Sequence, residues 1–306
     1  MNPFRAILRP EYLYRPRQIW RRLGRDAILA RNEVRLAWEL PVEIGPTSCV
    51  GEDIRNLGIY DRVVAEAIFR LLDPGEQAFD IGANIGQNAS IMALVAGRRG
   101  RIVAFEPGPI AWRVLAKNVE SWADYDLAPI AVVRKGVSSR IGTGLLREAA
   151  DFGQFSMEAY HPGTTWSSPE KPREIEIELT TLDAFVPDQT EIGLIKMDVE
   201  GHESSVLDGA RELLRQKRIR DIIFEDYRPQ PSPVTARLQA AGYTVFALFP
   251  AWRKPVLLTL KEHAEGKSGS HVLLNFLGTL DPERAIARFE SAGWKCFRSS
   301  ARFKQK

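Results

Sequence analysis

Phe79-Asp80-Ile81-Gly82-Ala83-Asn84-Ile85-Gly86-Gln87-Asn88 is the stretch that decides the fold of this chain. It ends an apolar run at 77–81, which predicts a strand, and opens a run of small residues at 87–96, which predicts a helix. Gly82 and Gly86 let the backbone turn tightly and let a ligand approach closely. Ligands of open α/β sheets bind at the carboxyl ends of the strands. The stretch therefore predicts a ligand-binding turn in an α/β fold, with an ordinary strand-to-helix turn as the alternative.

Polar side chains around this turn indicate which ligand it binds. Asp80, at the end of the strand, would repel a pyrophosphate and attract the ammonium group of a methionine moiety. Asn84 stands where the second glycine of the dinucleotide motif G-x-G-x-x-G would fall, and the third glycine is missing. Glu106 follows the next predicted strand, 101–105, where a carboxylate can accept hydrogen bonds from both hydroxyls of a ribose. Taken alone, Glu106 is equally typical of a solvated charge at a strand end.

Predicted helices and strands alternate along the central zone, about 59–250. Helices are predicted at 60–72, 87–96, from 109 onward, 203–217 and 233–241. Strands are predicted at 77–81, 101–105, 130–134, 174–180, 192–197, 221–224 and 243–249. This alternation implies βαβ units, and hence a doubly wound, mostly parallel α/β sheet. Two further apolar runs, 256–260 and 271–277, are interpreted as sheet strands, the second at or near the edge, before a short helix at 282–292.

A second constellation of polar residues closes a later predicted strand. Alternation places Lys196 and Asp198 on one face of that strand, with Asp198 at the carboxyl edge of the sheet near the first motif. Glu200 and His202 follow in the turn. Glu203 is explained by its position at a helix start, because acidic groups there offset the helix dipole. Lys196 could simply extend its stem along apolar surface, whereas we expect Asp198 and Glu200 to be functional.

The bulk composition is that of an ordinary globular protein. The chain has 306 residues, with 42 Lys and Arg against 39 Asp and Glu. The resulting net charge of +3 is too small for a dedicated nucleic-acid binder. The two cysteines, Cys49 and Cys296, exclude a disulfide framework and a cysteine-rich zinc site. No apolar run has the length that spans a bilayer, and the N-terminus lacks the apolar core of a signal peptide, so we expect a cytoplasmic protein.

The first zone, 1–58, is predicted to be a basic, partly helical N-terminal extension of a domain that spans 59–306. It is rich in arginine, with aromatic residues between the arginines. One interpretation is weak peripheral contact of residues 1–35 with anionic lipid on the inner face of the membrane. The other packs a helix face around Trp20 on the core or on a partner subunit. We favour packing, because Gly24 and several prolines make a poor membrane helix.

Five segments, in their order and spacing, are together specific enough to indicate a family. They cover about 77–226 and read FDIGANIGQNAS, VAFEPGPIAWRVLAKNV, TTLDAF, IGLIKMDVEGHESSVLDGA and DIIFED. With these segments the chain resembles the FkbM family of class I methyltransferases. The resemblance implies a Rossmann-like fold with a seven-stranded sheet whose last strand is antiparallel. It also implies S-adenosylmethionine as the methyl donor and a hydroxyl oxygen as the usual acceptor.

Carried over by position, the resemblance assigns roles to individual residues. It implies that the donor is lined by four residues of the first motif, Asp80, Gly82, Asn84 and Gly86. It further implies that Glu106 holds the ribose and that Asp198 and Glu200 face the transfer region. His202 stands where many members carry a small residue. Acceptors in the family are varied and include polyketide and sugar hydroxyls, so the resemblance does not name this substrate.

The chemistry we expect is methylation of a hydroxyl on a small molecule or on a sugar of a glycan. A base assists because a hydroxyl is a weak nucleophile, and Asp198 is the first candidate, with His202 the second. In another version, Asp198, Glu200 and Glu203 hold a divalent cation that acidifies the hydroxyl. Two functions of other classes stand as alternatives, a nicotinamide-dependent oxidoreductase and a non-catalytic donor-binding interaction module.

Overall fold

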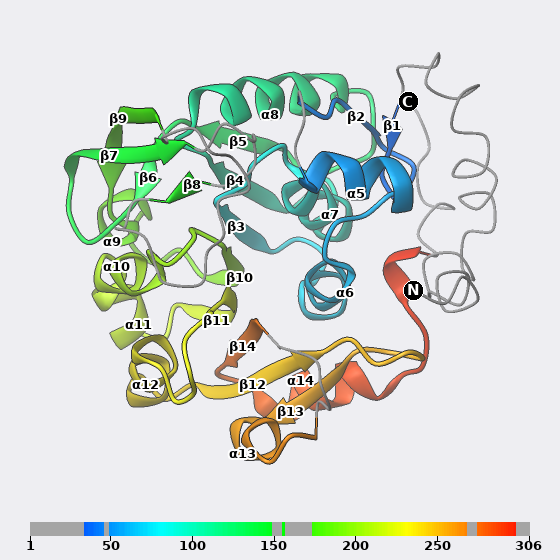
Figure 1. Cartoon of the computed structure of the whole chain (residues 1–306), viewed down its shortest axis with the longest axis vertical. Coiled ribbons are helices and arrows are strands. Elements are labelled where there is room, and N and C mark those ends of the chain that lie inside the picture. Colours follow the sequence, from blue (N-terminus) through cyan, green and yellow to red (C-terminus); the bar gives the residue numbers. More distant parts are fainter. Residues whose placement is uncertain (1–33, 46–48, 149–154, 157–172, 268–273, 298–306) are drawn as a thin grey trace.

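A computed structural model describes residues 34–45, 49–148, 155–156, 173–267 and 274–297 of the chain (Figure 1). The helix predicted around Trp20 lies outside these residues, as does most of the segment between 148 and 173. No helix within the described ranges is both long and apolar enough to cross a membrane.

A large, mostly parallel sheet forms the centre of the molecule. It has eight strands in the order β13-β12-β14-β11-β10-β3-β4-β5. Their bounds are β3 Gln77–Ile81, β4 Arg101–Phe105, β5 Ile130–Val133, β10 Ile192–Met197, β11 Ile219–Glu225, β12 Thr244–Phe249, β13 Val256–Thr259 and β14 Asn275–Thr279. Strands β5, β4, β3, β10 and β11 pair in parallel, and β14 pairs antiparallel with both β11 and β12. The chain winds outward in one direction from β3 and in the other from β10, so the predicted doubly wound α/β fold with an antiparallel last strand is confirmed.

Two expectations about the sheet are corrected. The run predicted at or near the edge forms β14, which instead inserts between β11 and β12. Its residues Phe276 and Leu277 are both buried, as an interior strand requires. The edge belongs to β13, an eighth strand beyond the expected seven, which pairs antiparallel with β12 and is only partly buried.

Helices cover both faces of this sheet and divide the core into two layers. One layer contains α6 (Arg62–Leu71), α7 (Gln87–Ala96), α8 (Pro109–Ser121) and α14 (Pro282–Glu290). The other contains α9 (Leu182–Phe185), α10 (Glu203–Asp208), α11 (Arg211–Arg215) and α12 (Pro233–Ala240). A short helix, α13 (Leu260–Ala264), follows β13. Alternate residues of each strand face opposite layers, as Ala78 and Phe79 do in β3.

The helix predicted over 203–217 is in fact broken into α10 and α11. At the break, a Cβ on Gly209 would lie 2.0 Å from the carbonyl oxygen of Ser138. The Gly209 carbonyl accepts the Asp183 N–H at 2.9 Å, and the Asp183 carboxylate in turn accepts the N–H groups of Glu212 and Leu213. These contacts satisfy helix-end groups that a continuous helix would bond internally.

A smaller four-stranded sheet lies beside the main one. Its strands are β6 (Gly136–Val137), β7 (Gly142–Glu148), β8 (Phe155–Ser156) and β9 (Arg173–Thr180), in the order β6-β9-β7-β8. The strand predicted at 174–180 is therefore present, but it belongs to this second sheet. Its partner β7 was not predicted, because the run contains two glycines and charged residues at its end.

The described part of the N-terminal zone packs into the core. A two-stranded ribbon, β1 (Val34–Arg35) with β2 (Pro41–Val42), leads into α5 (Cys49–Leu57). Trp38, at the tip of the ribbon, is fully buried, and its Nε1 donates a hydrogen bond to Ser90 Oγ at 3.1 Å. The described residues of 34–45 and 49–58 are thus part of the layer that also contains α6 and α7.

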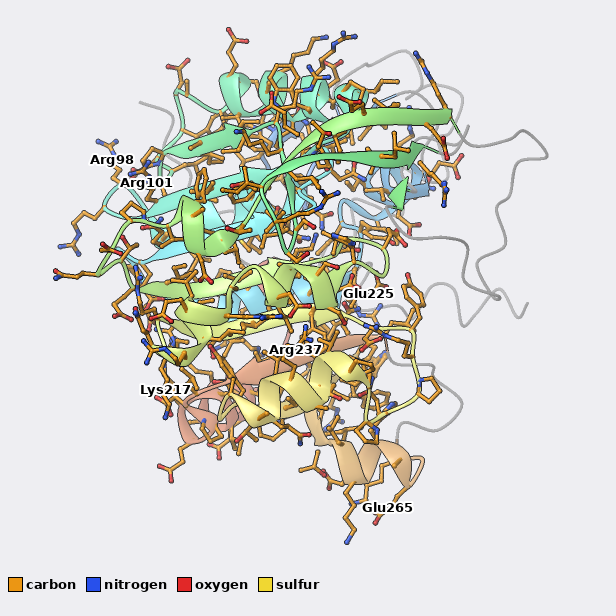
Figure 2. All side chains as sticks on the ribbon, turned by 90° about the vertical axis from the view of Figure 1, so that its left-hand side faces the viewer. Arg98, Arg101, Lys217, Glu225, Arg237 and Glu265 are labelled. Atoms are coloured by element: carbon orange, nitrogen blue, oxygen red, sulfur yellow. The ribbon has the colours of Figure 1, made fainter. Side chains whose placement is uncertain are left out.

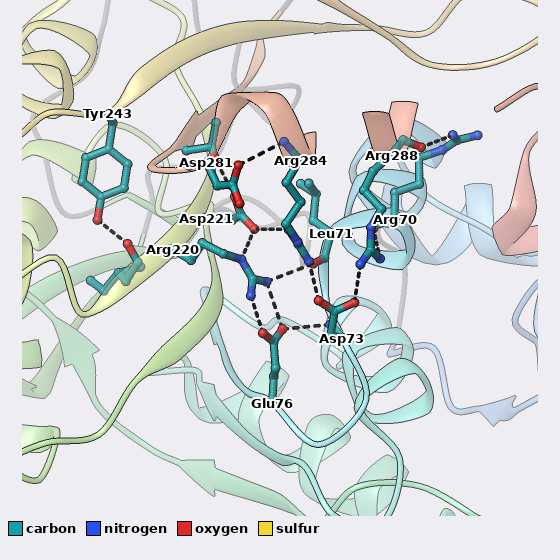
Figure 3. A network of polar contacts seen from close by, with 12 residues as sticks. Arg70, Leu71, Asp73, Glu76, Arg220, Asp221, Tyr243, Asp281, Arg284 and Arg288 are labelled. Carbon is teal, nitrogen blue, oxygen red and sulfur yellow. Dashed lines mark hydrogen bonds and ion pairs between the residues drawn. The ribbon is translucent and has the colours of Figure 1, made fainter. Parts of the chain in front are cut away.

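A network of ion pairs closes the amino-terminal edge of the sheet (Figure 3). Arg220 contacts both oxygens of Glu76, just before β3, and its Nε lies 2.9 Å from the Asp221 carboxylate. Asp221 is fully buried and also accepts from Thr279 Oγ1 at 2.6 Å and from Arg284 Nη1 at 3.3 Å. The network therefore joins β11, β14, α14 and the start of β3.

We expect Asp221→Ala to lower the free energy of unfolding by about 3 kcal/mol or more, because it leaves two largely buried guanidinium groups short of a partner. Denaturant unfolding would measure the loss. Asp208→Ala, which removes ion pairs to the more exposed Arg211 and Arg237, is the matched control and should cost less than about 1 kcal/mol. Equal losses in the two variants would contradict a stabilising role for the network.

Candidate active site

The glycine-rich turn after β3 is held against the end of β10. Gly82 has a positive φ of 76°, and a Cβ there would lie 2.0 Å from the carbonyl oxygen of Asp198. The N–H of Asp198 donates to Ile81 O at 3.1 Å, which extends the β3–β10 pairing beyond the strands. Gly86, also at positive φ, starts α7, and a Cβ there would lie 2.6 Å from the Leu115 side chain. Both glycines are thus required by close packing.

Glu106 joins the end of β4 to this turn. Its Oε2 accepts the N–H of Asn84 and its Oε1 accepts the N–H of Gly108, both at 2.8 Å. Burial raises the pKa of Glu106 to about 7, against the opposing effect of these two hydrogen bonds. Each carboxylate oxygen has a second lone pair, so Glu106 can accept two further hydrogen bonds from a ligand.

Lys196 occupies the centre of the site. Its Nζ donates to Gly82 O at 3.0 Å and lies 3.4 Å from Asp80 Oδ1 and 3.5 Å from Asp198 Oδ2. Burial lowers the pKa of Lys196, but Asp198 and Asp80 outweigh it, and the net shift is upward. Lys196 is therefore a buried cation shared by the turn and by two carboxylates.

Asp80 lies beneath the turn rather than in the cleft. Its side chain is fully buried and does not line the open space, and burial raises its pKa while Lys196 opposes the rise. Gly86 likewise lies outside the lining. Any effect of Asp80 on a ligand would therefore pass through Lys196 and the turn.

A cleft of about 980 Å³, open to solvent, runs over the carboxyl ends of the central strands. Six of the eight residues predicted for the site line it: Gly82, Asn84, Glu106, Asp198, Glu200 and His202. A smaller hollow of about 340 Å³ adjoins it and adds Asp61 and Asn275. The two spaces share five lining residues: Tyr60, Asn88, Lys196, Asp198 and Glu225.

Glu200 and His202 lie on the turn between β10 and α10. Glu200 has a positive φ of 52°. Burial raises its pKa to about 8, with further contributions from Asp198 and Glu203. The ring of His202 is positioned by Ser138, whose Oγ lies 3.0 Å from His202 Nε2. The turn thus brings a carboxyl group and an imidazole to the rim beside Asp198.

Glu203 does not join this group. Its Oε1 accepts the N–H groups of Val199 and Gly201 at 3.2 and 3.3 Å, and the side chain is buried. It stabilises the turn, as expected of an acidic residue at a helix start. Within the residues that the structure describes, no three or more His, Cys, Asp or Glu side chains are grouped as metal ligands would be.

The sequence did not single out Glu225. It is the last residue of β11, as Asp198 directly follows β10, and Figure 2 shows it at the opposite edge of the sheet from Arg101 and Lys217. A carboxylate that closes the strand in DIIFED could have been found by the rule that sites form at carboxyl ends of parallel strands.

Comparison with known proteins gives consistent matches. The family profile described as "Methyltransferase FkbM domain" matches residues 80–245. A 31-O-demethyl-FK506 methyltransferase, FkbM, from Streptomyces tacrolimicus is 26% identical over 211 residues, which cover 58% of this chain and 75% of that protein. Methyltransferase sdnD from Sordaria araneosa is 25% identical over 218 residues, which cover 61% and 82%. A solved O-methyltransferase from Thermotoga maritima aligns over 74% of this chain and 69% of its own, with 10% identity and a TM-score of 0.44.

We expect Gly82→Ala to destabilise the protein and to abolish binding of S-adenosylhomocysteine. The new methyl group meets both a positive φ and a backbone oxygen at 2.0 Å, so the turn and β10 must separate. Melting temperature and calorimetry would measure the two effects. Gly75→Ala is the matched control: it has a positive φ of 88°, but the nearest atom to its Cβ is 4.0 Å away. It introduces the backbone strain without the steric clash and should retain binding. Binding that survives in Gly82→Ala would show that the close approach is dispensable.

Proposed function

This chain belongs to the FkbM-domain family and is an S-adenosylmethionine-dependent methyltransferase, and from that premise we propose that it methylates a hydroxyl oxygen of a small molecule or of a sugar in a glycan. The family assignment sets aside the nicotinamide oxidoreductase and the non-catalytic module. Support for an oxygen acceptor comes from the name of the S. tacrolimicus relative, which acts on a 31-O-demethyl compound. The observation that carries the proposal is the position of Asp198, shared by the main cleft and the smaller hollow.

The residues of the main cleft fit the donor. Glu106, directly after β4, has one lone pair left on each carboxylate oxygen, to which the ribose hydroxyls can donate. Asn84 and Gly82 form the adjoining wall, and the Asp198 carboxylate lies at the rim, where a negative charge suits a cationic donor. When bound, the donor supplies a methyl group on a sulfonium, which is a good leaving group.

The smaller hollow is where we place the acceptor. Its polar walls include Asp61, whose carboxylate accepts from Asn275 Nδ2 at 2.6 Å, and its apolar walls include Val64 and Ile223. A hydroxyl entering from this side meets Asp198 at the boundary with the main cleft. Holding the hydroxyl in line with the methyl group can supply about 7–11 kcal/mol of the barrier reduction.

Asp198 is the base in this proposal. It takes the proton of the acceptor hydroxyl as the new carbon–oxygen bond forms. Lys196, 3.5 Å away, orients the carboxylate and is itself fixed by Gly82 O. His202, on the same turn and held by Ser138, is the second candidate.

The first test concerns the donor and uses pH. Since the pKa of Glu106 is about 7, the ionised acceptor of ribose hydrogen bonds predominates only above that pH. We expect the affinity for S-adenosylhomocysteine to rise by up to about tenfold per pH unit below pH 7 and to level off above it. Glu106→Gln should weaken binding by about 2 kcal/mol and flatten this dependence. Wild-type protein that gives no calorimetric signal with millimolar ligand would refute the donor site.

The second test concerns the base. Asp198→Asn should lower turnover by about 100-fold or more. Turnover would be measured as transfer of labelled methyl groups to an acceptor found by screening hydroxylated small molecules and glycans. Its affinity for S-adenosylhomocysteine should stay nearly constant, because the variant keeps the shape of the side chain. Equal losses of affinity and turnover would reassign Asp198 to donor binding. Activity that is abolished by a chelator and restored by magnesium would favour the divalent-cation version.

A further inference from the structure

Strand register places Glu225 beside Asp198. In the parallel pair of β10 and β11, Lys196 lies opposite Ile223 and Met197 opposite Phe224. Asp198 and Glu225 occupy the next position along the two strands. Residues two apart share a face of a strand, so both carboxyl groups point to the side on which Lys196 lies.

Both carboxyl groups line the same two spaces, and Asp198, through its charge and a side-chain hydrogen bond, raises the pKa of Glu225. An ionised carboxylate has acceptors only, so a hydrogen bond between two of them requires a proton on one. The pair is half-buried and lies at the boundary between the main cleft and the smaller hollow. A proton on either carboxyl group would let the two side chains bond to each other.

The charges around the pair decide which member holds that proton. On β10, the Lys196 Nζ lies 3.5 Å from Asp198 Oδ2, so this end of the pair has a cation beside it. On the far side, Glu225 hydrogen-bonds with Tyr227 and faces the like charge of Glu200. Across the smaller hollow, the carboxylate of Asp61 is engaged by the N–H groups of Val63 and Val64 and by Asn275.

We propose that Glu225 carries the shared proton and donates it in a hydrogen bond to Asp198, so that it acts as a positioning residue for the base. The hydrogen bond occupies one lone pair of Asp198 and holds the carboxylate in one orientation between Glu225 and Lys196. Burial, followed by Asp198 and Glu200, raises the pKa of Glu225 to about 10, which is consistent with a protonated carboxyl at neutral pH. The inference rests on the proposed function, in which Asp198 takes the acceptor's proton.

Carbon-13 NMR of side-chain carboxyl groups in the full-length, ligand-free protein tests this directly. Glu225→Gln identifies the Glu225 resonance by its loss. In the wild type, this resonance should keep its protonated shift beyond pH 8. In Asp198→Asn, the titration midpoint of Glu225 should fall by one pH unit or more, because the neighbouring negative charge is gone. Glu106 is the internal control and should titrate unchanged, because burial, two backbone N–H groups and the charges of Lys196 and Asp80 set its pKa.

Either of two results would overturn the proposal. One is a wild-type Glu225 that titrates near its ordinary pKa of 4.5. The other is an unchanged midpoint in Asp198→Asn, which would assign the shift to burial alone. Should resonances overlap, unfolding supplies a second measurement: the wild-type free energy of unfolding should fall relative to that of Glu225→Gln as pH rises from about 5 to 10, because only the wild type must ionise a buried carboxyl.

Activity supplies a final discrimination between a positioning role and a structural one. Glu225→Gln keeps a hydrogen-bond donor and should retain turnover within about threefold, whereas Glu225→Ala should lose about tenfold or more. A Gln variant as impaired as the Ala variant would show that the proton donor is irrelevant. Failure of the donor-binding test would sink the proposed function and leave the NMR titration of the pair unaffected.

Discussion

The site depends on one buried ammonium group, that of Lys196. Three oxygens surround its Nζ, from Gly82, Asp80 and Asp198, and they come from the two strands at which the sheet reverses its winding direction. A buried carboxylate is costly without a partner, and here two carboxylates share one cation. Because the same cation also holds the glycine-rich turn, the floor of the cleft and the Asp198 carboxylate are linked through one ammonium group.

A second polar network lies at the opposite edge of the sheet, where the parallel strands begin. The Arg220–Asp221–Arg284 network ties the antiparallel strand β14 to the amino-terminal ends of the parallel strands. Between the two networks, the strands are mostly apolar. Ion pairs connect the strands where they begin, and Lys196 connects β3 and β10 where they end. These contacts bring residues that are far apart in sequence within hydrogen-bonding distance.

Much of this could be predicted, and the limits have physical causes. The bounds predicted for β3, α7, β4 and β10 match the structure, because glycine or proline ends most of these segments and their apolar runs are continuous. The position of β14 could not be predicted, since periodicity describes burial but not which neighbour a strand selects. The break between α10 and α11 depends on contacts with Ser138 and Asp183 that local sequence does not encode.

The residues of the site show the same difference between features set by local sequence and features set by tertiary contacts. Residues within one motif, such as Gly82 and Asn84, could be predicted to lie together at the cleft because their spacing is local. The partnership of Glu225 with Asp198 was missed because it depends on the register of two strands separated by the helices α10 and α11. The prediction that Asp80 meets the ligand directly assumed an open strand end, whereas the side chain is fully buried and meets Lys196.

The packing of Trp38 has a consequence for how this domain could be transplanted. The family profile covers 80–245, but the fully buried Trp38 hydrogen-bonds with Ser90 in α7, the helix that begins at the glycine-rich turn. The packed unit is therefore larger than the segment that the profile covers. A chimaera that keeps only that segment would leave α7 without its tryptophan partner, so the residues before 80 support the glycine-rich turn through α7.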